Sequence, residues 1–340
     1  MLTGDHPVTA HAIAAHLGWP FASETGAEEI ITGDQLDAID DAALTDLIAY
    51  ANVFARIRPE QKHRLIQALH ARGEIVAMTG DGINDAPALR EADIGVAMGQ
   101  RGTEVARESA AMVLLDDNFA TVVTAVRNGR RIFDNLVRAF AYLIAFHPPL
   151  LLAALIVPLT GRPLLLLPVH LVLLELVVHP VVSLVFENDP ADADIMTRPP
   201  RRPHAGLMTR QLLQPLLLGL TLSVAVIGLY LGALARHITE DRARALAFVT
   251  LLLGQAILIL VLRRDGRTGQ HKIAANPVLF PIVAGIFAVT VAAVHIPAAA
   301  HILQLAPLGI VDWAVALAVA VVATCWFVVA PRRVHRRPHE

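Results

Sequence analysis

The chain has 340 residues, of which 55% are hydrophobic and 17% are charged, and its formal net charge is −2. Its mean hydropathy is +0.55, so the composition favours a membrane protein. The only cysteine, Cys325, excludes an internal disulfide bond, and we expect no nucleic-acid partner.

Residues 1–118 have the composition of a soluble domain in which strands alternate with helices. Short apolar runs rich in β-branched residues predict the strands, and amphipathic segments between them predict the helices. This alternation predicts a parallel, doubly wound α/β sheet, whose ligand lies at the carboxyl ends of the strands. The predicted strands are residues 53–55, 75–78, 94–98 and 112–115, and the predicted helices are 59–72, 87–92 and 103–109.

Two carboxylates, Asp81 and Asp85, lie four residues apart on a glycine-flanked turn between a predicted strand and a predicted helix. Carboxylate oxygens bind hard cations such as Mg²⁺, and glycine lets the backbone approach a phosphate closely. A shorter element, Thr3-Gly4-Asp5, repeats the order of hydroxyl, glycine and carboxylate. The sequence therefore predicts phosphate chemistry here; the alternative is that both turns are only structural.

Beyond Asp117 the pattern becomes helical and continues without a strong breaker through residues 127–131 into an apolar run. We expect residues 119–139 to form a stalk helix that leads from the soluble domain into the membrane. The alternative is a simple tether between the two parts.

Residues 140–331 are predicted to form a transmembrane domain with six helices. Each apolar run reaches, or nearly reaches, the 20 or so residues that a helix needs to cross the hydrocarbon core. The fourth run is the shortest, and prolines interrupt the first two. The predicted spans are residues 140–159, 164–186, 212–234, 245–262, 278–300 and 308–330.

The distribution of basic residues predicts that the N-terminus is cytoplasmic, in a multi-pass protein of the cell membrane. Loops on the cytoplasmic side are enriched in lysine and arginine, and this placement puts most basic residues there. Residues 332–340 then form a basic cytoplasmic tail, which we interpret as a topology signal rather than a nucleic-acid patch. The cytoplasmic group is Arg198, Arg201, Arg202, Arg210, Arg263, Arg264, Arg267, Lys272, Arg332, Arg333, Arg336 and Arg337; the opposite loops hold Arg162, Arg236, Arg242 and Arg244.

Four motifs of this chain resemble those of P-type cation-transporting ATPases, in the order of that family. The run MTGDGINDAPAL at 78–89 resembles the family's hinge signature, and TGD at 3–5 and RPEQK at 58–62 resemble two further motifs. The run DIMTRPPR at 194–201 is typical of the calcium-pump-like branch. The resemblance implies a partial haloacid-dehalogenase-like (Rossmannoid) phosphorylation domain, followed by membrane helices whose stalk couples chemistry to transport.

The resemblance also implies roles for individual residues in the phosphorylation site. Asp81 matches the Mg²⁺-binding aspartate, while Asn84 and Asp85 match residues placed around the phosphoryl group and its metal. The TGD motif, with Asp5, would contribute the Thr3 hydroxyl and the Gly4 amide to phosphoryl oxygens. Lys62 matches a lysine that neutralises developing negative charge; the alternative is an ordinary solvated helix residue.

Several parts of such a pump do not occur in this sequence. The Asp-Lys-Thr-Gly-Thr motif that carries the nucleophile is absent, as are the nucleotide-binding domain for ATP, the Thr-Gly-Glu loop and the first four membrane helices. We therefore expect residues 1–118 to fold poorly alone and to need an N-terminal pump half, so that activity of this chain by itself is uncertain. The rival hypotheses are a non-catalytic remnant or regulatory subunit, and a membrane-anchored phosphatase-like protein.

Ionisable and amide side chains within the predicted spans are candidates for the path of the transported cation. These are His147, Glu175, His179 and Gln255, and each differs from the residue that calcium pumps have at the matching position. Imidazole and carboxylate together suit Mn²⁺, Zn²⁺ or proton transfer better than Ca²⁺, which prefers oxygen ligands alone. The alternative is that Glu175 and His179, four residues apart on one helix face, satisfy each other without a bound ion.

Overall fold

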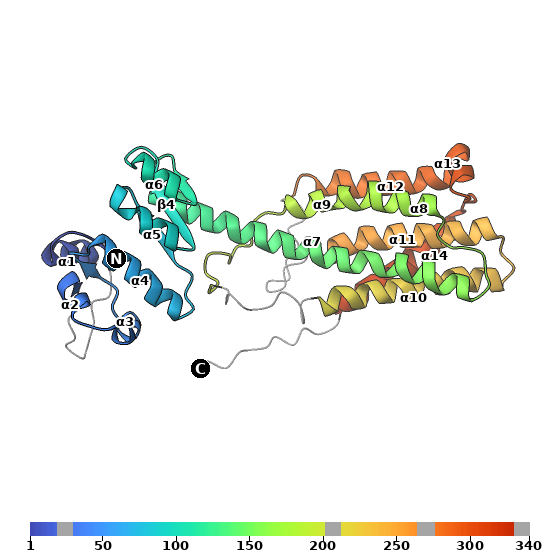
Figure 1. Cartoon of the computed structure of the whole chain (residues 1–340). Coiled ribbons are helices and arrows are strands. Elements are labelled where there is room, and N and C mark those ends of the chain that lie inside the picture. The colour runs from blue at the N-terminus through green and yellow to red at the C-terminus, as the bar shows by residue number, and fades with distance from the viewer. Residues whose placement is uncertain (19–29, 201–211, 264–275, 330–340) are drawn as a thin grey trace. The chain divides into compact units, whose positions relative to one another are not determined.

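The computed structural model describes residues 1–18, 30–200, 212–263 and 276–329. The described chain divides into two compact units (Figure 1). The N-terminal unit contains Met1–Val126, and the helical unit contains Arg127–Pro200 and the described residues after 211. The predicted basic tail, residues 332–340, lies outside the described residues.

The N-terminal unit alternates strands and helices, and its elements follow the sequence prediction closely. All four predicted strands and all three predicted helices have a counterpart within a few residues. The strands are β1 (Ile31–Thr32), β2 (Phe54–Ala55), β3 (Ala77–Gly80), β4 (Ile94–Met98) and β5 (Met112–Leu114). The helices are α1 (Pro7–His16), α2 (Gly33–Asp37), α3 (Asp41–Leu47), α4 (Pro59–Ala71), the 3₁₀ turn η1 (Ile83–Asp85), α5 (Ala86–Glu91) and α6 (Glu104–Ser109).

Every described strand pair is parallel, but the strands form two sheets. One sheet has the order β3-β4-β5, and the other pairs β1 with β2. Leu2 adds a single parallel bridge to Phe54, whose amide donates to the Met1 carbonyl. The predicted parallel pairing of the strands is therefore present, but among the described residues it is divided between two sheets, because the ladder that contains Leu2 does not pair with β3.

Apolar packing joins the two sheets where hydrogen bonds do not. Leu2 contacts both the hydrophobic cluster under β3 and the cluster around β2. Helix α4 does the same, because Ile66 belongs to the first cluster and Leu65 to the second. The carboxyl ends of the strands are thereby held near the amino end of α4, where Lys62 lies.

The helical unit consists of long apolar helices. Four segments are long and apolar enough to cross a membrane, and α12 and α14 are apolar but shorter within the described residues. The elements are α7 (Phe119–Leu159), α8 (Pro168–Leu173), the π turn η2 (Leu174–Val178), α9 (His179–Glu187), α10 (Leu213–Ala235), α11 (Glu240–Leu262), α12 (Leu279–His295), α13 (Pro297–Ile302) and α14 (Ile310–Val329). Helix α7 runs without a break through the predicted stalk and the first predicted span.

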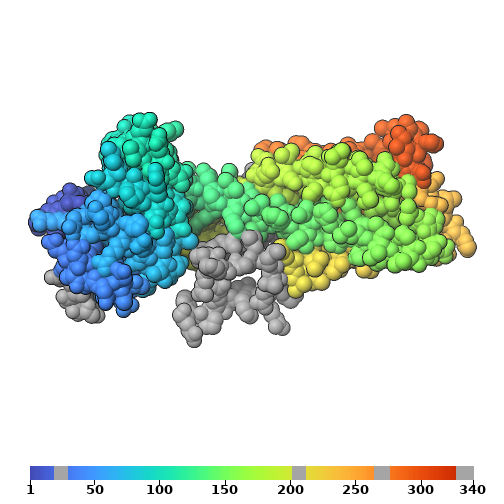
Figure 2. Space-filling model, in the orientation of Figure 1, coloured from blue at the N-terminus to red at the C-terminus, as the bar shows by residue number. Residues whose placement is uncertain are grey.

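Helix α11 is the most buried element of the helical unit. Most of its residues between Ala243 and Val261 are inaccessible, and on the face drawn in Figure 2 other helices cover most of it. Small residues also allow the helices around α11 to approach one another. A Cβ on Gly219 of α10 would lie 2.7 Å from the Ala145 carbonyl oxygen of α7. Pro149 cannot donate to that carbonyl, so the helix interface forms where α7 lacks one backbone hydrogen bond.

The second membrane segment is not a regular α-helix. Residues Leu174–Val178 form a π turn, in which the His179 amide donates to the Leu174 carbonyl five residues earlier. Pro180 follows directly, and its ring has no N–H and clashes with the carbonyl four residues before it. The wider turn avoids that clash and places Glu175 within it.

Candidate functional site

In the N-terminal unit the strand β3 ends in the turn that carries Asp81 and Asp85. Asp85 is buried, and its Oδ1 lies 2.6 Å from the Lys62 Nζ of α4. Its other oxygen accepts hydrogen bonds from the backbone amides of Asp81 and Gly82, at 3.3 and 3.2 Å. The structure thus brings together Lys62 and Asp85, two residues 23 positions apart in the sequence.

The environment of Asp85 keeps its carboxyl ionised. Burial by itself would raise the pKa of Asp85, but the hydrogen bond and charge of Lys62 and the amides of Gly82 and Asp81 lower it below its ordinary value. These contacts therefore contribute their full stabilisation of the fold above pH about 4, the ordinary carboxyl pKa. That stabilisation is lost as the pH falls through the lowered pKa of Asp85.

Gly80 makes room for this carboxylate. A Cβ at Gly80 would lie 2.5 Å from the Asp85 Cβ and 2.8 Å from its Cγ. We expect Gly80→Ala to displace Asp85 and to lower the free energy of unfolding by about 1–3 kcal/mol, as overpacking does. Gly82→Ala is the matched control, because the φ of Gly82 is −99° and its Cβ would meet Asp85 only at 3.5 Å. Chemical unfolding of both variants measures the difference, and equal losses would contradict this account.

The other predicted residues of this unit lie at strand ends and near the surface. The Thr3 hydroxyl donates to Asp5 Oδ2 at 2.9 Å and accepts from the Asp5 amide at 3.1 Å, so the TGD turn closes on itself. Gly4, Asp5, Asp81 and Asn84 are exposed. The Asp81 carbonyl accepts from the Thr103 amide at 2.9 Å, which fixes the turn against the start of α6.

The donor set of this turn fits Mg²⁺. Asp81 presents an exposed carboxylate and Asp85 an ionised one, and Mg²⁺ is commonly held by one or two carboxylates together with waters and phosphate oxygens. Among the described residues, no group of three or more His, Cys, Asp or Glu side chains is arranged to hold a metal ion. The Lys62 ammonium lies beside the same carboxylate, where it can meet the charge of a phosphate.

In the helical unit, three of the four predicted cation residues lie together. His147 Nε2 is 3.4 Å from Glu175 Oε1, and His179 Nδ1 is 3.9 Å from Glu175 Oε2. His147 Nδ1 is 2.8 Å from the Leu143 carbonyl oxygen, which can only accept, so this nitrogen carries the proton. His147 Nε2 therefore faces the Glu175 carboxylate, so a proton or a cation between them could be shared by both groups.

Gln255, the fourth predicted residue, is fully buried beside this cluster. Its Nε2 donates to the Phe146 carbonyl at 3.3 Å, while its Oε1 is buried without a hydrogen-bond partner. The Tyr142 hydroxyl is likewise buried without a partner, and its ring stacks on His179. Sequence reasoning missed Tyr142; its signal was a phenol five residues before His147 in an apolar run. The two unsatisfied polar atoms belong to residues that contact Phe146 and His179, and they mark a polar centre inside the bundle.

A second polar centre, which the sequence did not single out, joins the ends of several helices. Asp189 and Arg263 form a buried ion pair, with 2.6 Å between Asp189 Oδ1 and Arg263 Nη2. Asn276 Nδ2 donates to the same carboxylate at 2.6 Å, and Asn135 of α7 donates to the Asp189 carbonyl at 2.9 Å. Together these three contacts connect α7 with the residues after α9, the end of α11 and the residues just before α12.

The DIMTRPPR segment extends this centre along α7. Arg198 pairs with Asp134 of α7 at 2.7 Å and with Asp192 at 2.7 Å, and Arg138 of α7 reaches the same Asp192 at 2.8 Å. The hydrogen bond to Asp194 raises the pKa of the Arg198 guanidinium further above its ordinary value, so it stays charged. This motif therefore has a structural role that its sequence alone did not reveal.

Comparison with known protein families assigns both parts of the chain. The model described as "Cation transporting ATPase, C-terminus" matches residues 163–332, and that of the haloacid dehalogenase-like hydrolases matches residues 1–93. The chain is 46% identical over 225 residues to a protein of Mycobacterium tuberculosis named probable cation-transporting ATPase F, covering 66% of this chain and 25% of that protein.

Two further relatives cover more of the chain. A calcium-transporting ATPase of Bacillus subtilis is 37% identical over 280 residues, covering 82% of this chain and 30% of that protein. The calcium-transporting ATPase 1 of Bacillus cereus is 35% identical over 340 residues, covering 95% of this chain and 38% of that protein. The chain thus spans between a quarter and two fifths of the length of these relatives.

Proposed function

Because the chain belongs to the cation-transporting ATPase family and matches its C-terminal part, we propose that it supplies the Mg²⁺-binding half of a phosphorylation site and the last membrane helices of an ATP-driven pump. The observation that carries this proposal is the Lys62–Asp85 contact at 2.6 Å, beside the exposed Asp81 carboxylate at the end of a parallel strand. ATP hydrolysis and transport belong to the whole pump, of which this chain is one part.

In the proposed site each residue has a distinct task. Mg²⁺, when bound, neutralises phosphoryl charge, and Asp81 with Asp85 would hold it. Lys62 orients Asp85 and places a positive charge where the transferring phosphoryl group develops negative charge. Thr3 and Gly4 would donate a hydroxyl and an amide to phosphoryl oxygens, and Asn84 lies on the same exposed turn as Asp81.

The proposed topology has a cytoplasmic N-terminus, a stalk at residues 119–139 and six membrane spans. Four long apolar helices and the two shorter ones, α12 and α14, support six crossings. The unbroken helix Phe119–Leu159 supports the stalk, because movement at its start reaches its membrane part without an intervening hinge. The positions of basic residues in the loops support the orientation.

We place the cargo site at His147, Glu175, His179 and Gln255. Apart from Asp134 in the stalk part of α7, Glu175 is the one carboxylate remote from a helix end in the described membrane segments, whereas Ca²⁺ takes six to eight oxygen ligands. Two imidazoles beside one carboxylate favour a transition-metal ion such as Mn²⁺ or Zn²⁺, or a proton, as cargo. The three side chains are not arranged as a metal site in the described structure, so a bound metal ion would require them to rearrange around it.

Glu175→Gln tests this site. The amide keeps the shape of the side chain but removes the charge that faces both histidines, so we expect the cation concentration for half-maximal phosphorylation to rise tenfold or more. The measurement is phosphoenzyme formation with Mn²⁺, Zn²⁺ or Ca²⁺ in the assembled pump. Ser183→Ala, one turn beyond His179 on α9, is the matched control. An unchanged cation response in Glu175→Gln would overturn the assignment.

The proposed function itself is tested by complementation. The purified chain is reconstituted alone, and also joined to the N-terminal part of the Bacillus cereus relative that it does not match. We expect no phosphoenzyme from the chain alone and a cation-stimulated phosphoenzyme from the joined protein. Turnover by the chain alone, or a folded joined protein that never becomes phosphorylated, would contradict the proposal.

A further inference from the structure

The first two membrane segments of the helical unit run in opposite directions and meet at successive levels (Figure 1). The ring centroid of Tyr142 on α7 lies 5.5 Å from that of Phe186 on α9. Four residues later, the ring centroid of Phe146 lies 5.1 Å from that of His179, where α9 begins. Contacts that advance along α7 therefore go back along the other segment. The ion pair of the cargo site comes next in this order, so it forms only if the two segments keep one register.

Asn135 fixes α7 to the end of α9. Its side chain is buried, and its Nδ2 donates to the Asp189 carbonyl at 2.9 Å and to the Glu187 carbonyl at 3.3 Å. Glu187 is the last residue of α9, so both acceptors lie where that helix ends. A side-chain amide nitrogen carries two N–H donors, and here two main-chain oxygens accept from it. The contact therefore joins the side chain of one helix to the backbone of the other.

The ion pairs near Asn135 specify the register less tightly. Arg138 reaches Asp192 at 2.8 Å, and Arg198 reaches Asp134 at 2.7 Å, and each pair joins α7 to the stretch that follows α9. An arginine side chain is long and has many rotamers, so it can keep its ion pair while the backbones shift. The short asparagine side chain cannot, because its hydrogen bonds weaken steeply with distance and angle.

The spacing on the two sides of this anchor matches. His147 lies twelve residues after Asn135 on α7, and Glu175 lies twelve residues before Glu187 on the returning segment. An α-helix rises about 1.5 Å per residue, so each arm measures about 18 Å, less about one residue's rise for the π turn in the second. The anchor thus holds the imidazole and the carboxylate at one level, in agreement with the 3.4 Å between His147 Nε2 and Glu175 Oε1.

We propose that Asn135 is a positioning residue of the cargo site: its two backbone contacts set the register between α7 and the segment that carries Glu175, and this register holds His147 opposite the carboxylate. A slip by one residue would move His147 about 1.5 Å along the helix axis and turn it by about 100°, away from Glu175. The inference rests on the proposed cargo site, but the register is a property of this chain and can be measured without transport.

Cross-linking between the two cargo positions measures the register. The full chain carries His147→Cys and Glu175→Cys, together with Cys325→Ser so that no other thiol remains. It is purified in detergent and treated with a short bifunctional thiol reagent. The rate at which the internal cross-link forms, followed by mass spectrometry, reports how often the two positions meet.

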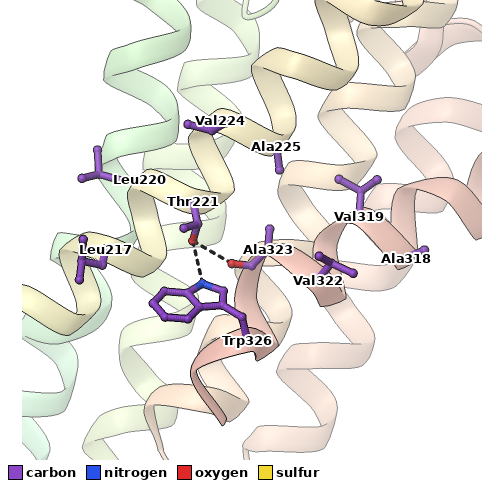
Figure 3. Close-up of a pocket in the computed structure, with 10 residues that line it drawn as sticks. All are labelled: Leu217, Leu220, Thr221, Val224, Ala225, Ala318, Val319, Val322, Ala323 and Trp326. Atoms are coloured by element: carbon purple, nitrogen blue, oxygen red, sulfur yellow. Dashed lines mark hydrogen bonds between the residues drawn. The ribbon is translucent and has the colours of Figure 1, made fainter. Parts of the chain in front are cut away.

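Asn135→Leu in this background removes the donors at similar side-chain volume, and it is expected to lower the cross-linking rate about tenfold or more. Two controls remove comparable contacts that do not involve α7, and both should leave the rate unchanged. Asn276→Leu takes an equally buried amide away from Asp189, and Thr221→Val takes from α10 the hydroxyl that accepts from Trp326 of α14 (Figure 3). An unchanged rate in Asn135→Leu, or an equal fall in Asn276→Leu, would overturn the proposal.

A second variant and a functional measurement complete the test. Asn135→Ser leaves a side chain too short to reach both carbonyls, so it should also slow cross-linking and replaces Asn135→Leu if that variant does not fold. In the assembled pump, Asn135→Leu should raise the cation concentration for half-maximal phosphorylation about tenfold and leave the maximal level unchanged. Asn128→Leu, at an exposed asparagine of the same helix, should change neither.

The two measurements separate this inference from the proposed function. Slow cross-linking in Asn135→Leu, together with an unchanged cation response in Glu175→Gln, would reject the cargo site and keep the register. Normal cross-linking in Asn135→Leu, together with a weakened cation response in Glu175→Gln, would keep the cargo site and reject the role of Asn135.

Discussion

Replacement of Lys62 by alanine is expected to lower the rate of phosphoenzyme formation about 100-fold to 1,000-fold in the assembled pump. This is the loss usually seen when one preorganised donor to a developing negative charge is removed. Lys62 is partly buried and contacts the Asp85 carboxylate at 2.6 Å, so its removal acts on the site in two ways. The charge near the phosphoryl group disappears, and the pKa of Asp85 rises because the group that lowers it is gone.

The measurement is acid-stable phosphoenzyme formed from labelled ATP, as a function of time. Gln67→Ala is the matched control, because Gln67 is exposed on the same helix α4. Thermal unfolding of both variants separates a chemical effect from loss of the fold. A Lys62→Ala pump that is phosphorylated at the rate of the unchanged protein would remove Lys62 from the proposed site.

Replacement of Arg244 by leucine is expected to destabilise the helical unit by about 1–3 kcal/mol for each buried carbonyl that loses its donor, while the half-exposed acidic partners Glu240 and Asp241 return to solvent. The Arg244 side chain is only 2% exposed and lies in the first turns of α11. It donates to the carbonyls of Leu164 and Gln304 at 3.1 and 2.9 Å, and it pairs with Glu240 and Asp241. One guanidinium thus joins the loop before α8, the loop before α14 and the amino end of α11.

Arg242→Leu is the control for this effect. Arg242 lies on the same turn and pairs with Asp312 at 2.9 Å, but its side chain is 51% exposed, and exposed pairs contribute about 0–1 kcal/mol. Unfolding of the purified chain in detergent, followed by circular dichroism, compares the two variants. Equal stabilities would show that the buried contacts of Arg244 do not hold the three segments together.

The elements of the N-terminal unit could be predicted because local patterns determine them. Apolar runs predict β4 and the residues that lead into β3, and Pro59 and Gly82 mark where α4 and the 3₁₀ turn η1 begin. The motif resemblance assigns Lys62 and Asp85 to one site but did not predict their direct contact, and the division into two sheets was not predicted either. That division depends on which strands find partners, and spacing along the chain carries no information about it.

In the helical unit the sequence located the apolar segments better than their polar contacts. Glu175 and His179 were predicted to meet because four residues separate them on a helix. The pairing of Asp189 with Arg263 joins residues 74 positions apart, and no local signal links them. The orphan hydroxyl of Tyr142 was equally hidden, because burial of a single atom depends on how the surrounding helices pack.

The π turn at Leu174–Val178 gives the helix that carries Glu175 one residue more than an α-helix of the same rise would hold. Converting that turn to α geometry passes the extra residue along the helix and rotates the residues in between by about 100° about the helix axis. Such a rotation, with a rise of about 1.5 Å, would carry Glu175 away from His147, but it would also bring the Pro180 ring against the carbonyl four residues before it. The proline beside the turn thus favours the register in which Glu175 faces His147.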